Sequence, residues 1–158
     1  MEQKLFPRTM VGGLSLPRMI IGTNWMCGFS HTGPAADQFI KRVHSSPEAA
    51  ARVIEAFMEY GVDAIMGVFN AGHVIDKACL IAEDRTGKHI IRINTPPLNM
   101  DDNAAARREA EATINASAKI GCEFCFPHHS STEQLVNKNL SAIPRLPDYL
   151  KMIRDSGQ

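Results

Sequence analysis

Gly61-Val62-Asp63-Ala64-Ile65-Met66 (residues 61–66) contains the step that decides the fold: a glycine that ends a helix, followed at once by a short apolar strand. The same step recurs at Gly87, before the run 89–93, and at Gly121, before the run 122–126. A glycine just past a helix end adopts the left-handed conformation that closes the last turn. Strands that alternate with helical segments predict a parallel sheet, so the chain is expected to be an α/β protein.

A hairpin and one more strand are expected ahead of these units. Residues 5–19 predict the hairpin, because Gly12-Gly13 is suited to a tight primed turn between two largely apolar runs. Residues 19–24 (Met-Ile-Ile-Gly-Thr-Asn) predict a strand that is buried in a parallel sheet. The connection 25–45 is long, and we expect a short helix within it near residues 38–43.

Helix-start signals and helical spacing predict the remaining elements. Ser46 suits an N-cap and Pro47 the first position of a helix that ends at Gly61. Further helices are expected over 73–86, 101–120 and 133–137, and from Pro147 to Gly157. No linker or charge block divides the chain, so residues 1–158 are expected to form a single domain: a hairpin (about 5–19) and four βα units (about 19–157).

Four parallel βα units fit two architectures. They are either half of a TIM (β/α)8 barrel, with the hairpin closing its bottom, or a small open parallel sheet. An open doubly wound sheet usually carries a glycine-rich phosphate loop after its first strand, but the segment 22–28 matches neither G-x-G-x-x-G nor a P-loop. The half-barrel is therefore favoured. A complete barrel needs about 250 residues, so the chain would be an incomplete barrel whose open sheet edges invite a homo-oligomer.

Charge and composition argue against several partners. The chain has 17 basic and 17 acidic residues, which argues against nucleic acid and against an anionic membrane surface. No apolar stretch approaches the ~20 residues of a membrane span, and Met1–Lys4 lack the apolar core of a signal peptide. A cytoplasmic location is expected. Cys122 and Cys125 form a C-x-x-C, but positions three apart on a strand face opposite ways, so two buried thiols are expected.

Polar side chains recur where each predicted strand ends. In α/β barrels the site lies at the carboxyl ends of the strands, and amide and hydroxyl groups there can bind substrate oxygens. The same residue types are also ordinary caps and turn residues. The residues near these strand ends that we expect to bind a small-molecule ligand are Thr23, Asn24, Trp25, Asn70, Asn94 and Thr95.

Pro127-His128-His129-Ser130 is the sharpest local feature. A histidine there can act as a general acid or base. Adjacent histidines on a strand point to opposite sides, so one of His128 and His129 is expected to face the site, in a pocket beside Asn24 or Asn94. No H-x-H or H-E-x-x-H motif supports a metal centre, and the sequence identifies neither a metal nor a cofactor.

Simpler roles are expected for two other histidines. His31, in the long first connection, is placed to fold over the mouth of the site. His73 stands at a helix start and is expected to be structural.

At this point the chain resembles a known family. The hairpin, then Leu-Pro-Arg-Met-Ile-Ile-Gly-Thr (16–23), then Ala-Phe-Met-Glu-Tyr-Gly-Val (56–62), is similar to the start of an aldo/keto-reductase-like TIM barrel. The resemblance implies a barrel fold and a histidine after the fourth strand, for which His128 or His129 is the counterpart. It also implies an aspartate–tyrosine pair after the second strand and a lysine ending the third. The segment 68–73 lacks that pair, and Asn94 stands at the lysine's place.

Two classes of function follow. The first is a TIM-barrel-type enzyme domain that acts on a small carbonyl or sugar-like molecule by acid–base chemistry at the strand ends. Within it, an oxidoreductase with a nicotinamide cofactor and a metal-assisted isomerase, aldolase or hydrolase stay open. The second is a non-catalytic half-barrel whose exposed sheet edges mediate self-association.

Overall fold

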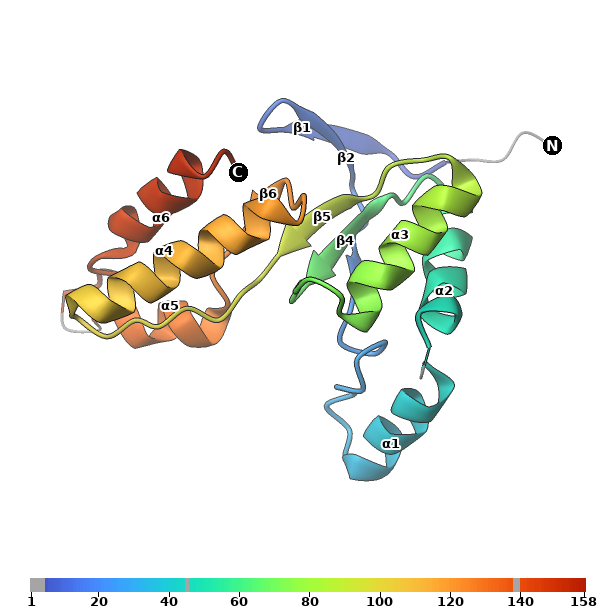
Figure 1. Ribbon diagram of the computed structural model, residues 1–158, viewed down its shortest axis with the longest axis horizontal. Coiled ribbons are helices and arrows are strands. Elements are labelled where there is room, and N and C mark those ends of the chain that lie inside the picture. The colour runs from blue at the N-terminus through green and yellow to red at the C-terminus, as the bar shows by residue number, and fades with distance from the viewer. Residues whose placement is uncertain (1–4, 45, 138–139) are drawn as a thin grey trace. The chain divides into compact units, whose positions relative to one another are not determined.

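The computed structural model describes residues 5–44, 46–137 and 140–158 (Figure 1). The chain forms two compact units, Met1–Arg92 (unit 1) and Ile93–Gln158 (unit 2). Met1–Lys4, at which we expected no signal-peptide core, lie outside the described residues. Within the described ranges no helix is both long and apolar enough to span a membrane.

The N-terminal hairpin forms as its glycines predict. Strands β1 (Arg8–Val11) and β2 (Leu14–Pro17) pair antiparallel, with Val11 opposite Leu14. The two-residue loop has positive φ at both Gly12 (56°) and Gly13 (84°). A type I′ turn requires that conformation at both central positions, and glycine adopts it without steric cost.

A four-stranded parallel sheet follows, so the predicted α/β class is confirmed. Its order is β3 (Ile21–Gly22), β4 (Ala64–Gly67), β5 (Ile91–Asn94) and β6 (Phe124–Cys125). Ile21 pairs with Ile65 in unit 1, and Ile93 pairs with Phe124 in unit 2. The strands are shorter than the apolar runs that predicted them.

Three helices belong to unit 1: α1 (Pro34–Val43), α2 (Pro47–Glu59) and α3 (Val74–Thr86). Helix α2 begins as predicted, because the Ser46 side chain accepts the Ala49 N–H. Helices α2 and α3 pack together, and Arg85 bonds Glu55 across them at 3.1 Å. The largest fully buried side chains of this unit come from α2, α3, β4 and the segments before β4 and β5: Ile54, Met58, Val62, Ile65, Ile75, Cys79 and Ile90.

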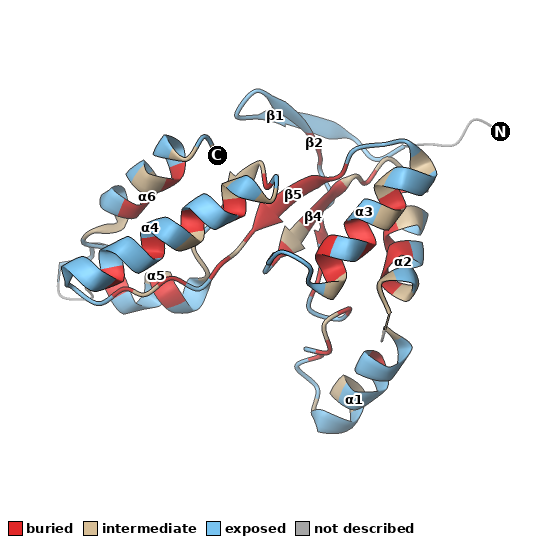
Figure 2. Cartoon of the chain, viewed as in Figure 1, coloured by how far each residue is buried: buried red, intermediate tan, exposed pale blue. Residues whose placement is uncertain are grey.

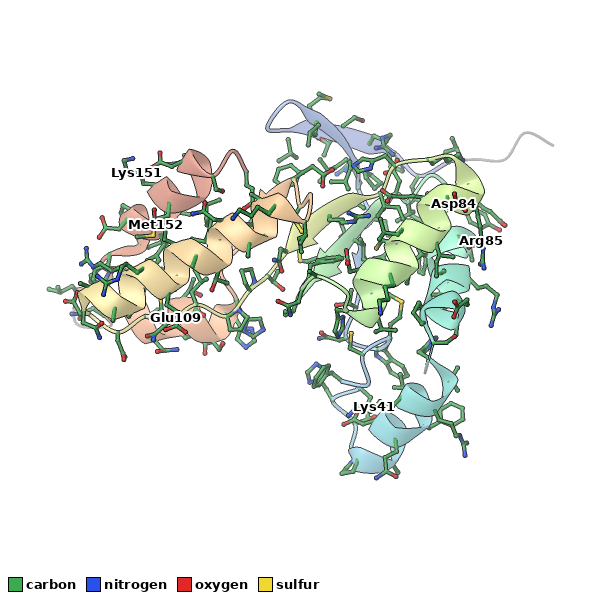
Figure 3. All side chains as sticks on the ribbon, in the orientation of Figure 1. Lys41, Asp84, Arg85, Glu109, Lys151 and Met152 are labelled. Carbon is green, nitrogen blue, oxygen red and sulfur yellow. The ribbon has the colours of Figure 1, made fainter. Side chains whose placement is uncertain are left out.

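Unit 2 holds α4 (Ala104–Lys119), α5 (His129–Leu135) and α6 (Leu146–Asp155). Its buried faces are drawn in red in Figure 2. The charged side chains of Glu109 and Lys151 instead project outward from α4 and α6, as do Asp84 and Arg85 from α3 in unit 1 (Figure 3). The core of unit 2 consists of Leu98, Met100, Ala110, Ile114, Cys125, Leu135, Tyr149 and Ile153.

The helix-ending glycines adopt the predicted left-handed conformation. The φ angles of Gly61, Gly87, Gly121 and Gly157 are 77°, 66°, 81° and 90°. Each lies at the end of α2, α3, α4 or α6. The repeated helix–glycine–strand step therefore exists as the sequence indicated.

Three helix starts differ from their predictions. Helix α1 begins at Pro34 rather than near residue 38. Helix α4 begins at Ala104, because Asn103 is its N-cap and accepts the Ala106 N–H at 2.9 Å. Helix α5 begins at His129, four residues before the expected start.

Candidate functional site

The first predicted site residues of unit 1 follow β3. Thr23 is only 4% exposed, and its side chain lies against Gly67 at the end of β4. Its backbone carbonyl accepts the Cys27 N–H at 2.9 Å. Thr23 is therefore a packing residue, with little surface to offer a ligand.

Asn24 is exposed and contacts a histidine of its own loop. Its Nδ2 lies 3.2 Å from Nε2 of His31. The Asn24 carbonyl also accepts the N–H groups of Cys27 and Phe29, which folds the chain back after β3. Because an amide nitrogen can only donate, His31 Nε2 acts as the acceptor. His31 therefore contacts one of the predicted strand-end residues, and its place over the mouth of a site stays a prediction.

A hydroxyl–carboxylate network that the sequence analysis missed shapes this loop. Asp37 Oδ1 accepts the Ser30 hydroxyl at 2.6 Å and the Ser30 N–H at 2.8 Å, and the Thr32 hydroxyl bonds Ser30 Oγ at 2.8 Å. The Ser30 hydroxyl is the main reason that the pKa of Asp37 lies below its ordinary value. His31, between Ser30 and Thr32, has φ of 58°. The spacing of Ser30, Thr32 and Asp37 around Gly33-Pro34 was the available signal.

The remaining unit 1 candidates are on its surface. Trp25 is 60% exposed. Asn70 is exposed, and its carbonyl accepts the His73 N–H at 3.0 Å. His73 in turn caps α3, because its Nδ1 accepts the Ile75 N–H at 3.4 Å. The structural role expected for His73 is confirmed.

The unit 2 candidates follow the paired strands β5 and β6. Asn94 is 2% exposed, and its carbonyl accepts the Phe126 N–H at 2.8 Å. Thr95 is half-buried. The next carbonyl, that of Pro96, accepts the His128 N–H at 3.0 Å. The backbone of His128 is thus fixed beside the end of β5.

His128 and His129 do not continue the strand, so the expectation of opposite-facing side chains on a strand is wrong. His128 is the N-cap of α5, and His129 is its first residue. The two rings lie 4.1 Å apart between centroids, at 45° to one another. His128 is half-buried, whereas His129 is exposed.

The hydrogen bonds of His128 determine its tautomer. Its Nδ1 accepts the Ser130 N–H at 3.3 Å and lies 2.7 Å from the Ser130 hydroxyl. A backbone N–H can only donate, so Nδ1 carries the lone pair and the neutral ring holds its proton on Nε2. Within the described part of the chain, Nε2 has no hydrogen-bond partner. Its N–H is available to a ligand.

The predicted set divides between the two units. Thr23, Asn24, Trp25 and Asn70 belong to unit 1, whereas Asn94, Thr95, His128 and His129 belong to unit 2. Unit 1 brings Asn24 to His31, and unit 2 brings the backbone of His128 to the end of β5. A single pocket shared by all of them stays a prediction.

The C-x-x-C cysteines are buried thiols, as predicted. Cys122 and Cys125 are both free and buried. Burial raises the pKa of Cys125 to about 11, so its reactive thiolate is scarce at neutral pH. Among the described residues no group of three or more His, Cys, Asp or Glu side chains is arranged to hold a metal ion.

Comparison with protein-family models, with curated proteins and with solved structures finds no match for this chain. The resemblance to aldo/keto reductases therefore stays an expectation. At the place of that family's lysine, Asn94 is buried and its amide carries no titratable proton.

Proposed function

We propose that the chain is the half-barrel part of a TIM-barrel-type enzyme, acting on a small carbonyl or sugar-like molecule by acid–base chemistry. The group that carries this chemistry is His128, at the carboxyl end of the β5–β6 pair. Parallel sheets bind ligands at that end, because their loops converge there. His129, the first residue of α5, and Thr95 of the same unit are proposed to supply contacts to the ligand.

The orientation of His128 is the observation that carries the proposal. Its backbone N–H is held by the Pro96 carbonyl, and its Nδ1 is occupied by both polar groups of Ser130. The ring is thereby fixed on one side and leaves Nε2–H for a ligand. A neutral imidazole with a preset donor can polarise a substrate carbonyl.

The chemistry is a proton exchange next to a carbonyl. The bond between the α-carbon and its hydrogen breaks and water takes the proton. The electron pair of that bond forms a carbon–carbon double bond, and the π pair of the carbonyl moves onto its oxygen. His128 Nε2–H donates to that oxygen and stabilises its developing charge. Return of a proton from solvent to the α-carbon completes the exchange.

Exchange of the α-hydrogen of glyceraldehyde in D₂O, followed by proton NMR, tests the role of His128. His128→Asn is the informative variant, because asparagine still caps a helix but carries no imidazole. His73→Asn is the matched control, since His73 caps α3 by the same Nδ1 contact. We expect at least about 100-fold slower exchange in His128→Asn and no change in His73→Asn. Equal rates in the wild type and His128→Asn, both above the buffer rate, would refute the role of His128.

Self-association is the second candidate function, and exposed apolar side chains at the outer strands favour it. Strands β3 and β6 are the outer strands of the sheet. Met19 and Ile20 precede β3, Phe126 follows β6, and all three are exposed. Unpaired strand edges with apolar neighbours pair readily with a second copy.

Light scattering during size-exclusion chromatography tests this alternative. A dimer that Phe126→Lys converts to a monomer supports edge pairing, because a lysine at an edge opposes it. Phe39→Lys is the matched control, since Phe39 is also an exposed aromatic residue and lies on α1, away from the strands in sequence. A wild-type monomer contradicts the proposal.

A further inference from the structure

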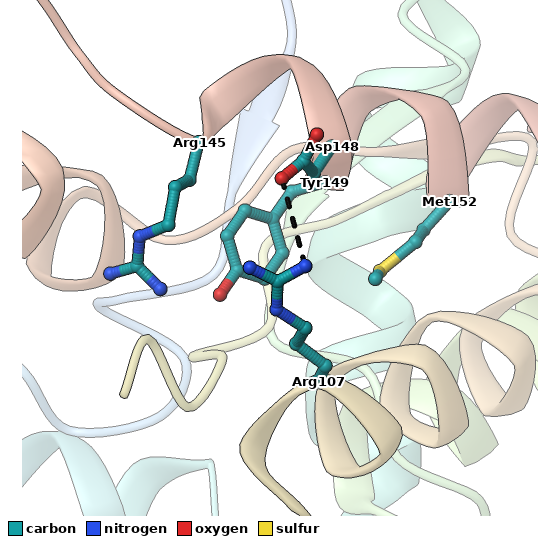
Figure 4. Close-up of a pocket in the computed structure, with 5 residues that line it drawn as sticks. All are labelled: Arg107, Arg145, Asp148, Tyr149 and Met152. Atoms are coloured by element: carbon teal, nitrogen blue, oxygen red, sulfur yellow. Dashed lines mark ion pairs between the residues drawn. The ribbon is translucent and has the colours of Figure 1, made fainter. Parts of the chain in front are cut away.

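A narrow pocket in unit 2 lies apart from the strand-end residues. Helices α4 and α6 are in contact, and residues of both line the pocket (Figure 4). Arg107 belongs to α4, Arg145 is the N-cap of α6, and the other three lining residues lie on α6: Asp148, Tyr149 and Met152. Two of these side chains are guanidinium groups. One is a phenol from the hydrophobic core.

Tyr149 presents a polar atom that the fold leaves unsatisfied. The residue is 2% exposed, and its hydroxyl has no hydrogen-bond partner among the described residues. Buried hydroxyl groups in proteins nearly always have a partner, so an orphaned one requires an explanation. In Figure 4 the ring points from α6 toward Arg107 and Arg145, with its hydroxyl between their guanidinium groups. Because a tyrosine hydroxyl can donate, an acceptor that also suits two arginines would satisfy it.

The arginines already share one carboxylate oxygen. Asp102 Oδ1 lies 3.2 Å from Nη2 of Arg107 and 3.4 Å from Nη1 of Arg145. Arg145 is also anchored through Nη2, which donates to the Met100 carbonyl at 2.7 Å. Asp102, however, is 70% exposed. An exposed ion pair of this kind contributes little free energy, so an incoming anion can displace the aspartate.

The ends of two helices add to this positive character. Asp102 and Asn103 precede the first turn of α4, and Arg145 is the N-cap of α6, where no side chain caps the helix. Helix N-termini carry partial positive charge. Asp148, in the first turn of α6, lies 4.0 Å from Arg107 and is also exposed. Both carboxylates are thus exposed, whereas the hydroxyl without a partner is buried.

We propose that this arginine–tyrosine pocket binds the oxyanion of a small ligand, a phosphate or a carboxylate group. One oxygen of the ligand replaces Asp102 Oδ1 between Arg107 and Arg145, and another accepts the Tyr149 hydroxyl. Arginine suits this role because its planar fork matches both anions. The site is independent of the chemistry proposed for His128.

Calorimetric titration of the full chain with inorganic phosphate, and separately with sodium acetate, tests the proposal. We expect Arg145→Gln to weaken binding about tenfold, since a charged hydrogen bond is lost. Tyr149→Phe is expected to weaken it about fivefold while leaving the unfolding midpoint unchanged or higher, because the deleted hydroxyl has no partner within the fold. Asp102→Asn is expected to tighten binding about threefold, because the competing carboxylate is gone. Arg108→Gln, an exposed neighbour outside the pocket, is the matched control.

The two anions distinguish the source of the oxyanion. Binding of phosphate alone assigns the site to phosphate-bearing ligands, and binding of acetate alone assigns it to carboxylates. Either outcome supports the proposal. Heats no larger than those of sodium chloride at equal ionic strength would overturn it, as would equal weakening by Arg145→Gln and Arg108→Gln. Unchanged affinity in both Tyr149→Phe and Asp102→Asn would also overturn it, because the arginines would then form only a structural ion-pair network.

Discussion

Substitution of Gly67 by alanine should destabilise unit 1 by a steric clash with a single buried side chain. A Cβ at Gly67 would overlap Thr23 Oγ1 and would lie 2.7 Å from Thr23 Cγ2 and 2.8 Å from Thr23 Cβ. Thr23 is buried and cannot swing into solvent. The end of β4 or the turn after β3 must therefore move to accept the methyl group.

The expected free-energy change follows from two opposing terms. Overpacking of a buried site costs about 3 kcal/mol at the upper end of its usual range. Alanine in place of glycine within a strand recovers about 0.7 kcal/mol, because glycine loses more backbone entropy on folding. The net destabilisation is roughly 2 kcal/mol. Amide hydrogen exchange at Ile65 in β4 should then be roughly 30-fold faster, where exchange reports opening of this unit.

The identity of the clashing atoms predicts which second substitution restores stability. Thr23→Ala removes Oγ1 and Cγ2 but leaves the 2.8 Å contact with Cβ, so it should restore part of the loss. Thr23→Gly removes all three contacts and should restore more of the lost stability, once the destabilisation caused by Thr23→Gly alone is subtracted. Gly22→Ala is the matched control, because nothing lies within 4 Å of a Cβ built at that strand-ending glycine. Equal exchange rates in Gly67→Ala and Gly22→Ala would refute the reasoning, as would the absence of coupling with Thr23.

Three further predictions concern caps, thiols and acid stability. Ser46→Ala should lower stability by about 1 kcal/mol in urea unfolding, because Ser46 caps α2, whereas Ser46→Asp should retain the cap. Iodoacetamide at pH 8 should modify the partly exposed Cys27 well before the buried Cys79, because burial raises the pKa of Cys79 to about 12. Mass spectrometry of timed samples measures the order of modification, and the reverse order would contradict this prediction. The Ser30 hydroxyl is the main group that lowers the pKa of Asp37 in the folded state. The ionised Asp37 therefore stabilises the fold above the unfolded-state pKa of this carboxyl, and that stabilisation is lost as pH falls through its folded-state pKa. Ser30→Ala should reduce that acid-dependent loss, as measured by unfolding between neutral and acidic pH.

Local signals predicted most of the fold because each depends on backbone chemistry alone. Gly61 and its counterparts end helices because they alone accept positive φ at low cost. Gly12-Gly13 forms the hairpin turn for the same reason, and Ser46-Pro47 starts α2 by an N-cap and a preset φ. Strand lengths were overestimated, because an apolar run continues past the residues that actually pair. Burial extends beyond β4 to Val62, for example.

The start of α5 was missed because its N-cap is not one of the usual residues. Serine, threonine, aspartate and asparagine dominate N-cap positions, so His128 gave no N-cap signal in the sequence. His128 caps instead through Nδ1, with Ser130 as donor. The same happens at His73. A histidine at the N-cap position can therefore replace an aspartate, serine or threonine, because its Nδ1 accepts the backbone N–H of the residue two positions later.

The site was predicted less well, because a strand-end position fixes a Cα and not the direction of its side chain. Thr23 follows β3 and Asn94 ends β5, but both are buried. Asn24, one residue after Thr23, is exposed and contacts His31. Tyr149 illustrates the converse: it is a core residue of α6, and that position leaves its hydroxyl without a partner among the described residues. Orphaned polar atoms are visible only once packing is known.

The two histidine caps indicate how structural and chemical roles coincide in this repeat. His73 and His128 both follow a strand, and in each Nδ1 accepts the N–H two residues ahead. That contact fixes the tautomer in both rings and directs Nε2–H away from the helix. Only His128 also has a hydroxyl at 2.7 Å, from Ser130, where the corresponding residue after His73 is Ile75. The cap alone therefore does not distinguish the two, and a functional difference between His128→Asn and His73→Asn must arise from Nε2 and its surroundings rather than from the helix.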